Sequence, residues 1–141
     1  MLPFDVELKP GESPYRQIVY AATRAVVSGE LLPGSPFPSV RVMSEALEVN
    51  PNTAHKVVAE LARSGLIEVL PGVGTVVAEW GPASPEERRL LLSEEVERLV
   101  VEARRLGLTE RDVLGAVSDR WSELFGRVQA EEEPGEVAFS G

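Results

Sequence analysis

Three side chains able to form hydrogen bonds lie close together in the sequence, at Asn52, His55 and Lys56. A helix that starts at Asn50-Pro51 would place all three within its first two turns, on the face opposite its apolar residues. An amide, an imidazole and an ammonium group can donate hydrogen bonds to base edges and to phosphates. This pattern therefore predicts the binding of a nucleic acid rather than covalent chemistry.

The composition gives little support to an enzyme. The chain of 141 residues has no cysteine and a single histidine, which excludes a thiolate nucleophile and most multi-histidine metal centres. Its serines have no general base nearby in the sequence, and the carboxylate pair Glu94-Glu95 falls on a predicted solvated helix face. The sequence has no Gly-x-x-x-x-Gly-Lys motif that could hold a nucleotide. We therefore expect no catalytic residue, no metal and no cofactor.

Helix start signals divide the first half of the chain into three helices. The predicted caps are Ser13, Ser39 and Asn50, and the first and third are followed directly by proline. A glycine ends the first helix and another ends the third. Residues 31–38, between the first two helices, include three prolines and a glycine and are predicted to form a rigid loop.

Two strands are predicted after the third helix, at residues 66–70 and 75–79, joined as a hairpin through Pro71-Gly72-Val73-Gly74. Three helices followed by a hairpin is the element order of a winged helix-turn-helix. Only Glu48-Val49 separate the second helix from the cap of the third. Such a short connection makes the third helix the natural recognition helix, presented across the second.

The composition changes at Gly81-Pro82, where a second region begins. Its sequence predicts two helices, at residues 84–106 and 109–126. The predicted fold class is α+β, a winged helix-turn-helix domain followed by a small two-helix C-terminal dimerisation region. The predicted domains are the winged-helix domain at 1–80, the helical region at 81–130 and an acidic, disordered tail at 131–141.

The apolar residues of the second region are more than two helices easily bury between them. Packing against the chain's own winged helix is one interpretation, which the sequence leaves open. An exposed apolar patch usually marks an interface, so we favour a homodimer contact in which Trp121 and Phe125 are anchors. The residues predicted to form this contact are Leu91, Val96, Leu99, Val100, Leu106, Trp121 and Phe125.

Three stretches within residues 13–77 carry a family resemblance: SPYRQI, SGELLPGSPFPSVRVMSEAL and VNPNTAHKVVAELARSGLIEVLPGVGTVV. They resemble the DNA-binding domain of GntR-type bacterial transcription regulators. The NPNT at residues 50–53 and the short helical C-terminal part are most similar to the YtrA-like subfamily. The resemblance implies a dimer formed by a two-helix C-terminal region, with no large effector domain. It also implies repression of the protein's own operon, often one that encodes an ABC transporter.

The resemblance also assigns roles to individual residues. The family's Pro-Ser-x-Arg motif ends at Arg41, which implies that this arginine reads DNA, with two hydrogen bonds to guanine. Asn52 and Thr53 match positions that touch the DNA backbone, and His55 or Lys56 takes the place of a second basic residue. The full set of residues predicted to bind DNA, which includes two helix starts and the wing tip, is Ser39, Arg41, Asn50, Asn52, Thr53, His55, Lys56, Gly72, Gly74 and Thr75.

Two positions depart from the family pattern. Val73 stands between the wing glycines where the family often has arginine or lysine, which argues against minor-groove reading by a charged wing tip. Pro51 stands where many members have an arginine of the recognition helix, although proline fits the YtrA-like version.

The formal charge of −9 at first argues against a nucleic-acid partner, because phosphate binding needs positive charge. The excess is uneven: residues 1–80 carry 6 basic and 9 acidic groups, whereas residues 81–141 carry 8 and 14. Two thirds of the negative excess therefore lies in the second region. We expect low non-specific affinity for DNA together with specific, salt-sensitive recognition.

The sequence therefore predicts a sequence-specific transcriptional regulator, a repressor that binds a palindromic operator on double-stranded DNA as a homodimer. The alternative is a winged helix used for protein contact, as a subunit of a larger assembly. A small-molecule effector is left open. With no apolar run long enough to span a bilayer and no signal-peptide pattern, the cytoplasm is the expected location and no membrane partner is expected.

Overall fold

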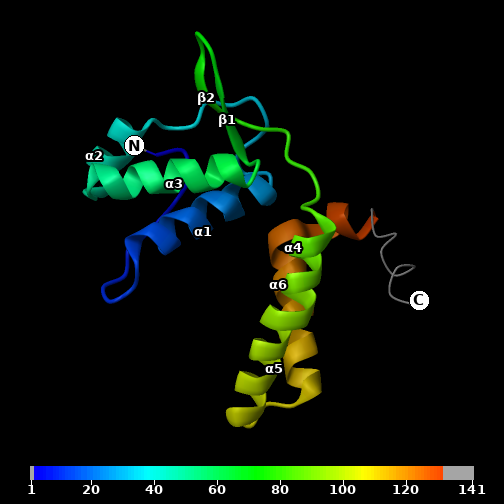
Figure 1. The fold of residues 1–141 in the computed structure, drawn as a ribbon. Helices are drawn as coiled ribbons and strands as arrows, with labels where there is room; N and C mark the ends of the chain where they lie inside the picture. The colour runs from blue at the N-terminus through cyan, green and yellow to red at the C-terminus, as the bar shows by residue number, and fades with distance from the viewer. Residues whose placement is uncertain (1, 132–141) are drawn as a thin grey trace. The chain divides into compact units, whose positions relative to one another are not determined.

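The computed structural model describes residues 2–131, with side chains described as far as residue 126 (Figure 1). The tail predicted at 131–141 lies, from residue 132 onward, outside the described residues. The chain forms two compact units, Met1–Pro82 and Ala83–Gly141. Each unit is described by itself below.

The first unit contains three helices, α1 (Pro14–Val27), α2 (Val40–Leu47) and α3 (Pro51–Arg63). All three predicted caps are confirmed. The side-chain oxygens of Ser13, Ser39 and Asn50 accept hydrogen bonds from the backbone N–H groups of Arg16, Val42 and Asn52 at 3.3, 3.2 and 2.7 Å. Each cap satisfies a donor that the helix itself leaves unpaired, and so fixes where the helix begins.

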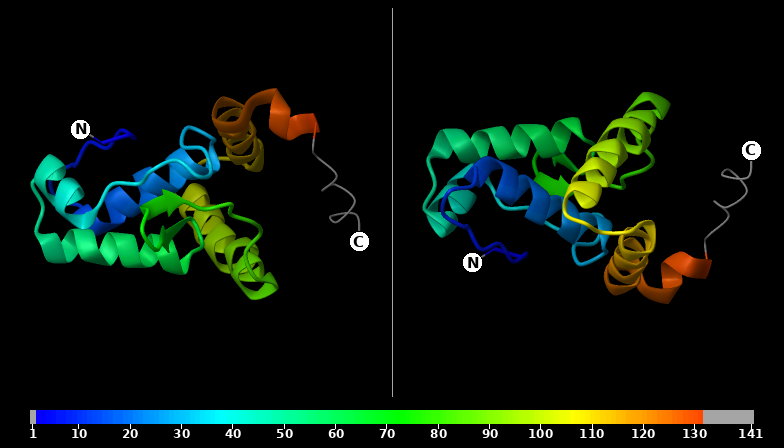
Figure 2. Two further views of the ribbon diagram at one scale, coloured as in Figure 1. Left: turned by 90° about the horizontal axis from the view of Figure 1, so that it is seen from above. Right: turned by 90° about the horizontal axis from the view of Figure 1, so that it is seen from below.

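The core of this unit is formed by the apolar faces of the three helices and by the sheet. Helix α3 packs against both α1 and α2 (Figure 2). The largest fully buried side chains, from α1, α2, α3 and the second strand, are Ile18, Met43, Leu61, Val57 and Val77. The N-terminal segment adds Phe4, whose ring stacks on Phe37 with centroids 5.7 Å apart. Burial of these faces determines which side of α3 is left for solvent.

The predicted hairpin is confirmed as strands β1 (Ile67–Leu70) and β2 (Gly74–Val77). They pair antiparallel, with Ile67 opposite Val77 and Leu70 opposite Gly74, so the connecting loop has the three residues 71–73. The tip extends away from the helices of its own unit (Figure 1). We call residues 67–77 the wing.

The segment before α2 pairs with β2, which the sequence did not predict. The N–H groups of Gly34 and Phe37 donate to the carbonyl oxygens of Val77 and Thr75 at 2.7 and 2.8 Å. The N–H of Val77 donates in return to the Ser35 carbonyl at 2.9 Å. Prolines argued against a strand here, but Gly34 and Phe37, on either side of Pro36 in the sequence, supply the N–H donors that proline lacks. The segment thus forms an isolated bridge at the edge of the sheet.

The second unit is helical, with α4 (Pro85–Leu90), a π-helical turn η1 (Leu91–Glu95), α5 (Val96–Arg105) and α6 (Glu110–Glu131). Ser84 and Glu87 form the predicted capping box at the start of α4. The helix expected at residues 84–106 is thus interrupted by one wider turn. The helix expected to end near Gly126 is recorded to Glu131, with a break at Gly126, where φ is 62° and ψ is −153°.

Across residues 2–131, no helix combines the length and the apolar character that crossing a membrane requires.

Candidate nucleic-acid interface

Helices α2 and α3 are connected by a tight turn of three residues, Glu48, Val49 and Asn50. Glu48 has φ 55° and ψ 46°, in the left-handed region, and this conformation ends α2. The N–H of Val49 then donates to the Ser44 carbonyl at 3.1 Å. The turn brings the two helices into contact and leaves one face of α3 exposed. This is the geometry of a helix-turn-helix.

The exposed face of α3 carries the residues expected there. Asn52, His55 and Lys56 are exposed, while Ala54 and Val57 on the other face are fully buried. Among the described side chains, Lys56 takes part in no ion pair. Its ammonium group is therefore available to an anion, as contact with a phosphate requires.

Arg41 lies in the first turn of α2, and its side chain is 78% exposed. Its Nη1 atom forms an ion pair with Oε2 of Glu45, 3.6 Å away and one turn farther along the same face. Within the described side chains, the guanidinium of Arg41 has no other partner, so its remaining N–H groups are free to donate.

Two of the residues predicted to bind DNA have side chains that already cap helices. Ser39 Oγ and Asn50 Oδ1 accept hydrogen bonds within the chain. At these two positions, the predicted phosphate contacts would therefore be made by the unpaired backbone N–H groups at the starts of α2 and α3. Thr53, next in the predicted set, is half-buried.

The tip of the wing is uncharged and apolar. Every residue from Val69 to Val77 lacks a charge, and Val73 is 70% exposed. Gly72 and Gly74 have φ of 77° and 116°, which side chains rarely adopt, so the loop needs glycine at both positions. Thr75 is half-buried, and its carbonyl oxygen accepts the bond from Phe37.

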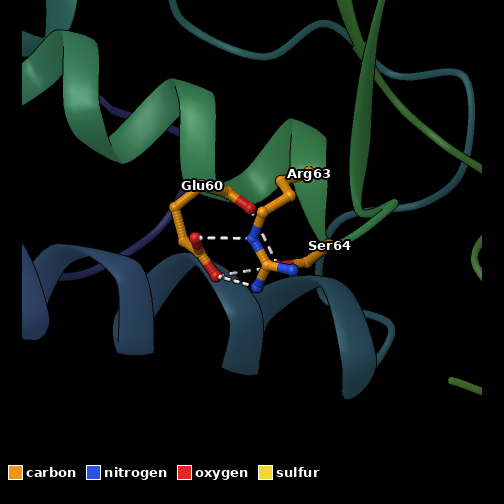
Figure 3. Close-up of polar contacts among 3 residues, drawn as sticks. All are labelled: Glu60, Arg63 and Ser64. Atoms are coloured by element: carbon orange, nitrogen blue, oxygen red, sulfur yellow. Dashed lines mark hydrogen bonds and ion pairs between the residues drawn. The ribbon is translucent and has the colours of Figure 1, made fainter. Parts of the chain in front are cut away.

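The last turn of α3 holds a cluster that the sequence analysis did not single out (Figure 3). Arg63 donates from Nε and Nη2 to the two carboxylate oxygens of Glu60 at 3.0 and 2.6 Å. Ser64 Oγ lies within hydrogen-bonding distance of the same carboxylate and of the Glu60 carbonyl. These partners, Arg63 above all, lower the pKa of Glu60. The basic residue at this end of α3 is therefore balanced by an acid, unlike Lys56.

The second unit exposes most of the residues predicted to form a dimer contact. Leu91, Leu99, Val100, Leu106 and Trp121 are each about half exposed or more, and Val96 is 39% exposed. Phe125 is half-buried, and its ring lies edge-on to Trp121 at 5.3 Å. Residues of α5 and α6 line an open groove, among them Val96, Leu99, Val100, Val113, Leu114 and Val117.

Solved structures of similar chains share this fold. A transcriptional antiterminator from Listeria monocytogenes EGD-e superposes with a TM-score of 0.77 at 26% identity, over 87% of this chain and 92% of that one. A GntR family transcriptional regulator from Listeria monocytogenes gives a TM-score of 0.59 at 25% identity, over 79% and 98% of the two chains. The predicted winged helix-turn-helix fold with a helical C-terminal region is confirmed.

Comparison of sequences leads to the same family. The model of the "Bacterial regulatory proteins, gntR family" matches residues 14–77. The HTH-type transcriptional regulator YhcF of Bacillus subtilis is 34% identical over 113 residues, which cover 80% of this chain and 93% of that protein. The HTH-type transcriptional repressor YtrA of the same bacterium is 33% identical over 95 residues, 67% and 73% of the two chains. This chain therefore belongs to the GntR family and is a DNA-binding transcriptional regulator, not an enzyme.

Proposed function

We propose that the protein is a repressor that binds a palindromic operator as a homodimer. The observation that carries the proposal is the uncovered apolar surface of the second unit. Among residues 83–126, Ala103 is the one buried apolar side chain, whereas twelve large apolar residues there are exposed. A second copy of the same unit would cover such a surface, because a twofold contact pairs each patch with itself.

The occupant of the groove between α5 and α6 is therefore proposed to be the partner's own helices. The exposed leucines and valines supply the apolar centre of the contact, and Trp121 with Phe125 supplies a paired aromatic anchor. Salt bridges such as Arg105–Glu102 on α5 and Arg120–Glu123 on α6 keep the charges on these two helices in balanced pairs. This arrangement limits repulsion between two acidic copies.

Each subunit would present α3 to one major groove. Arg41 would donate two hydrogen bonds to O6 and N7 of a guanine, and Lys56 would contact a phosphate. The other residues proposed to contact DNA are those of the predicted set on the starts of α2 and α3 and on the wing. With twofold symmetry, the two half-sites would lie about one helical turn apart, roughly 34 Å. A dimer bound across a promoter would block the polymerase.

Repression is favoured by one relative in particular. The Bacillus subtilis protein YtrA is named as a transcriptional repressor and aligns with 73% of its own length. The alignment spans 95 residues of this chain, more than the 64 residues that the family model matches.

Selection of bound duplexes from a random pool tests the proposal. We expect a single inverted repeat with half-site centres about ten base pairs apart, or a multiple of that spacing. Sedimentation of the full chain at micromolar concentration should show a dimer. A selected site without symmetry, or a stable monomer at that concentration, would overturn the homodimer mechanism.

A further inference from the structure

The ion pair between Arg41 and Glu45 is placed where it does little for helix α2. Arg41 lies in the first turn and Glu45 in the last turn of a helix of eight residues. A helix favours negative charge near its N-terminus and positive charge near its C-terminus, so both side chains oppose the dipole. An arginine four residues before a glutamate is also the weaker order for such a pair. Helix stability therefore gives no reason for this arrangement.

The pair is also too exposed to matter for the stability of the fold. The two side chains are 78% and 66% exposed, and the atoms Nη1 and Oε2 are 3.6 Å apart. An exposed pair at this separation is screened by water and salt and adds little to folding. What the pair does change is the charge that α2 presents outward. The cation proposed to read DNA is accompanied by an anion one turn away.

We propose that Glu45 is a positioning and specificity residue that acts through Arg41. This inference rests on the proposed contact between Arg41 and a base. On DNA of arbitrary sequence, Glu45 neutralises Arg41 and repels phosphate, so α2 gains little from non-specific contact. On the operator, guanine offers two acceptors, and the guanidinium can satisfy them while one of its five N–H groups remains toward Glu45. The carboxylate then holds the arginine in the orientation that the base requires.

Affinities for the operator and for random DNA, measured side by side, distinguish this role of Glu45 from a structural one. We expect Glu45→Gln to raise affinity for a random duplex about threefold to tenfold, since it removes a repelling charge and releases Arg41 to phosphates. Affinity for the selected operator should change much less, so the ratio of operator affinity to random-DNA affinity should fall. The dependence of log affinity on log salt for random DNA should steepen by about one per bound subunit.

Three further variants complete the test. Glu45→Asp keeps the negative charge, so its affinity for random DNA should stay as low as that of the wild type. Glu7→Gln removes an exposed acid from a hollow formed by the N-terminal segment, α1 and Glu30, and should leave the ratio unchanged. In an Arg41→Ala background, Glu45→Gln should have little effect, because the residue through which Glu45 acts is gone. Thermal unfolding of every variant confirms that the fold is retained.

The outcomes distinguish this inference from the proposed function. If Arg41→Ala lowers selectivity but Glu45→Gln leaves the ratio unchanged, the role of Glu45 is wrong and the base contact stands. An equal effect of Glu45→Gln with and without Arg41 would also overturn the inference, because Glu45 would then repel DNA independently of Arg41. If Arg41→Ala leaves selectivity unchanged, the base contact fails and this inference fails with it.

Discussion

Glu48 is the described residue that adopts positive φ without being glycine. Its side chain is exposed, and no hydrogen bond or ion pair of that side chain is recorded within residues 2–131. A left-handed conformation costs an ordinary residue free energy because its Cβ approaches its own carbonyl oxygen. Glycine would adopt this conformation at a lower cost in free energy, so Glu48 introduces backbone strain at the turn between α2 and α3.

Replacement of Glu48 by glycine should stabilise the first unit. We expect the free energy of unfolding to rise by about 0.5–1 kcal/mol, the relief of the left-handed strain less the extra freedom of glycine in the unfolded chain. Urea unfolding measures the change. Glu48→Ala is the matched control, because it removes the same charge but keeps the Cβ. An equal gain in both variants would show that charge, not backbone strain, is responsible.

Arg41 and Lys56 should differ in the kind of binding that they support. We expect Arg41→Ala to cost about 1–3 kcal/mol on the selected operator and to relax preference at one base of each half-site. Lys56→Ala should weaken operator and random DNA alike and reduce the salt dependence by about one per subunit. Fluorescence anisotropy with both duplexes separates the two patterns. Arg24→Ala, on an exposed part of α1, is the control, and unchanged base preference in Arg41→Ala would refute the assigned base contact.

At the scale of elements, the helix starts could be predicted and the irregular parts could not. Caps at Ser13, Ser39 and Asn50 are local, since one side chain bonds an N–H group two or three residues away, and local chemistry is readable in sequence. The pairing of Pro36 with Val76 is long-range, and proline concealed it. The break at Gly126 agrees with the predicted helix end, whereas the turn η1 lies in a stretch without glycine or proline that would mark it.

The candidate site shows the same division. The exposed face of α3 follows from helical periodicity, because burial of Ala54 and Val57 decides where Asn52 and Lys56 lie. The spacing of Arg41 and Glu45 was also present in the sequence, as residues four apart on one helix. The predicted cap at Ser39 and the connector Glu48-Val49 also imply that both charges oppose the helix dipole, and the structure adds the 3.6 Å ion pair and the exposure of both side chains. The left-handed conformation of Glu48, by contrast, ends α2 without any local sequence motif that signals it.

The start of α6 provides a prediction about pH. The Thr109 N–H donates to the Asp112 carboxylate at 2.8 Å, and the Asp112 N–H donates to Thr109 Oγ1 at 3.1 Å. The bonds from Thr109 lower the pKa of Asp112. A lowered pKa in the folded state means that this contribution is complete above the unfolded pKa and is lost as pH falls through the folded value.

The full chain with Asp112→Asn should therefore lose less stability than the wild type on acidification. Thermal unfolding, followed by the circular dichroism signal of the helices at about pH 7 and at about pH 3, measures the difference in stability between wild type and Asp112→Asn. We expect that difference to shrink at acidic pH. Asp119→Asn, at an exposed position farther along α6, is the control. A difference that is the same at both pH values would contradict the cap.

At the scale of the whole molecule, the acidic charge is shared unequally between the parts of the chain. Residues 1–80 carry three more acidic than basic groups, whereas residues 81–141 carry six more. Even the half with the helix-turn-helix is thus not basic, and its general attraction to the phosphate backbone is expected to be weak. Binding must depend on a few placed side chains and, in the proposed function, on two sites acting together.

Loss of the dimer should therefore weaken operator binding strongly. Leu99→Asp places a charge among the groove residues of α5, and we expect a monomer in sedimentation and a loss of operator affinity of about a hundredfold or more. Val101→Asp is the matched control, because Val101 is 62% exposed on the same helix and is not among the residues that line the groove. A Leu99→Asp protein that remains dimeric would place the contact elsewhere.

The bridge between Pro36 and Val76 has a consequence for the order in which the domain forms. The two residues are forty positions apart, and the chain between them contains both α2 and α3. Helices and a hairpin form between residues that are near in sequence. The segment at Pro36 can pair with Val76 only after the long loop between them has closed. This bridge at the edge of the sheet is thus completed late in folding. During synthesis, a chain that has not yet reached residue 76 lacks a finished sheet, so the wing becomes available only when the first unit is almost complete.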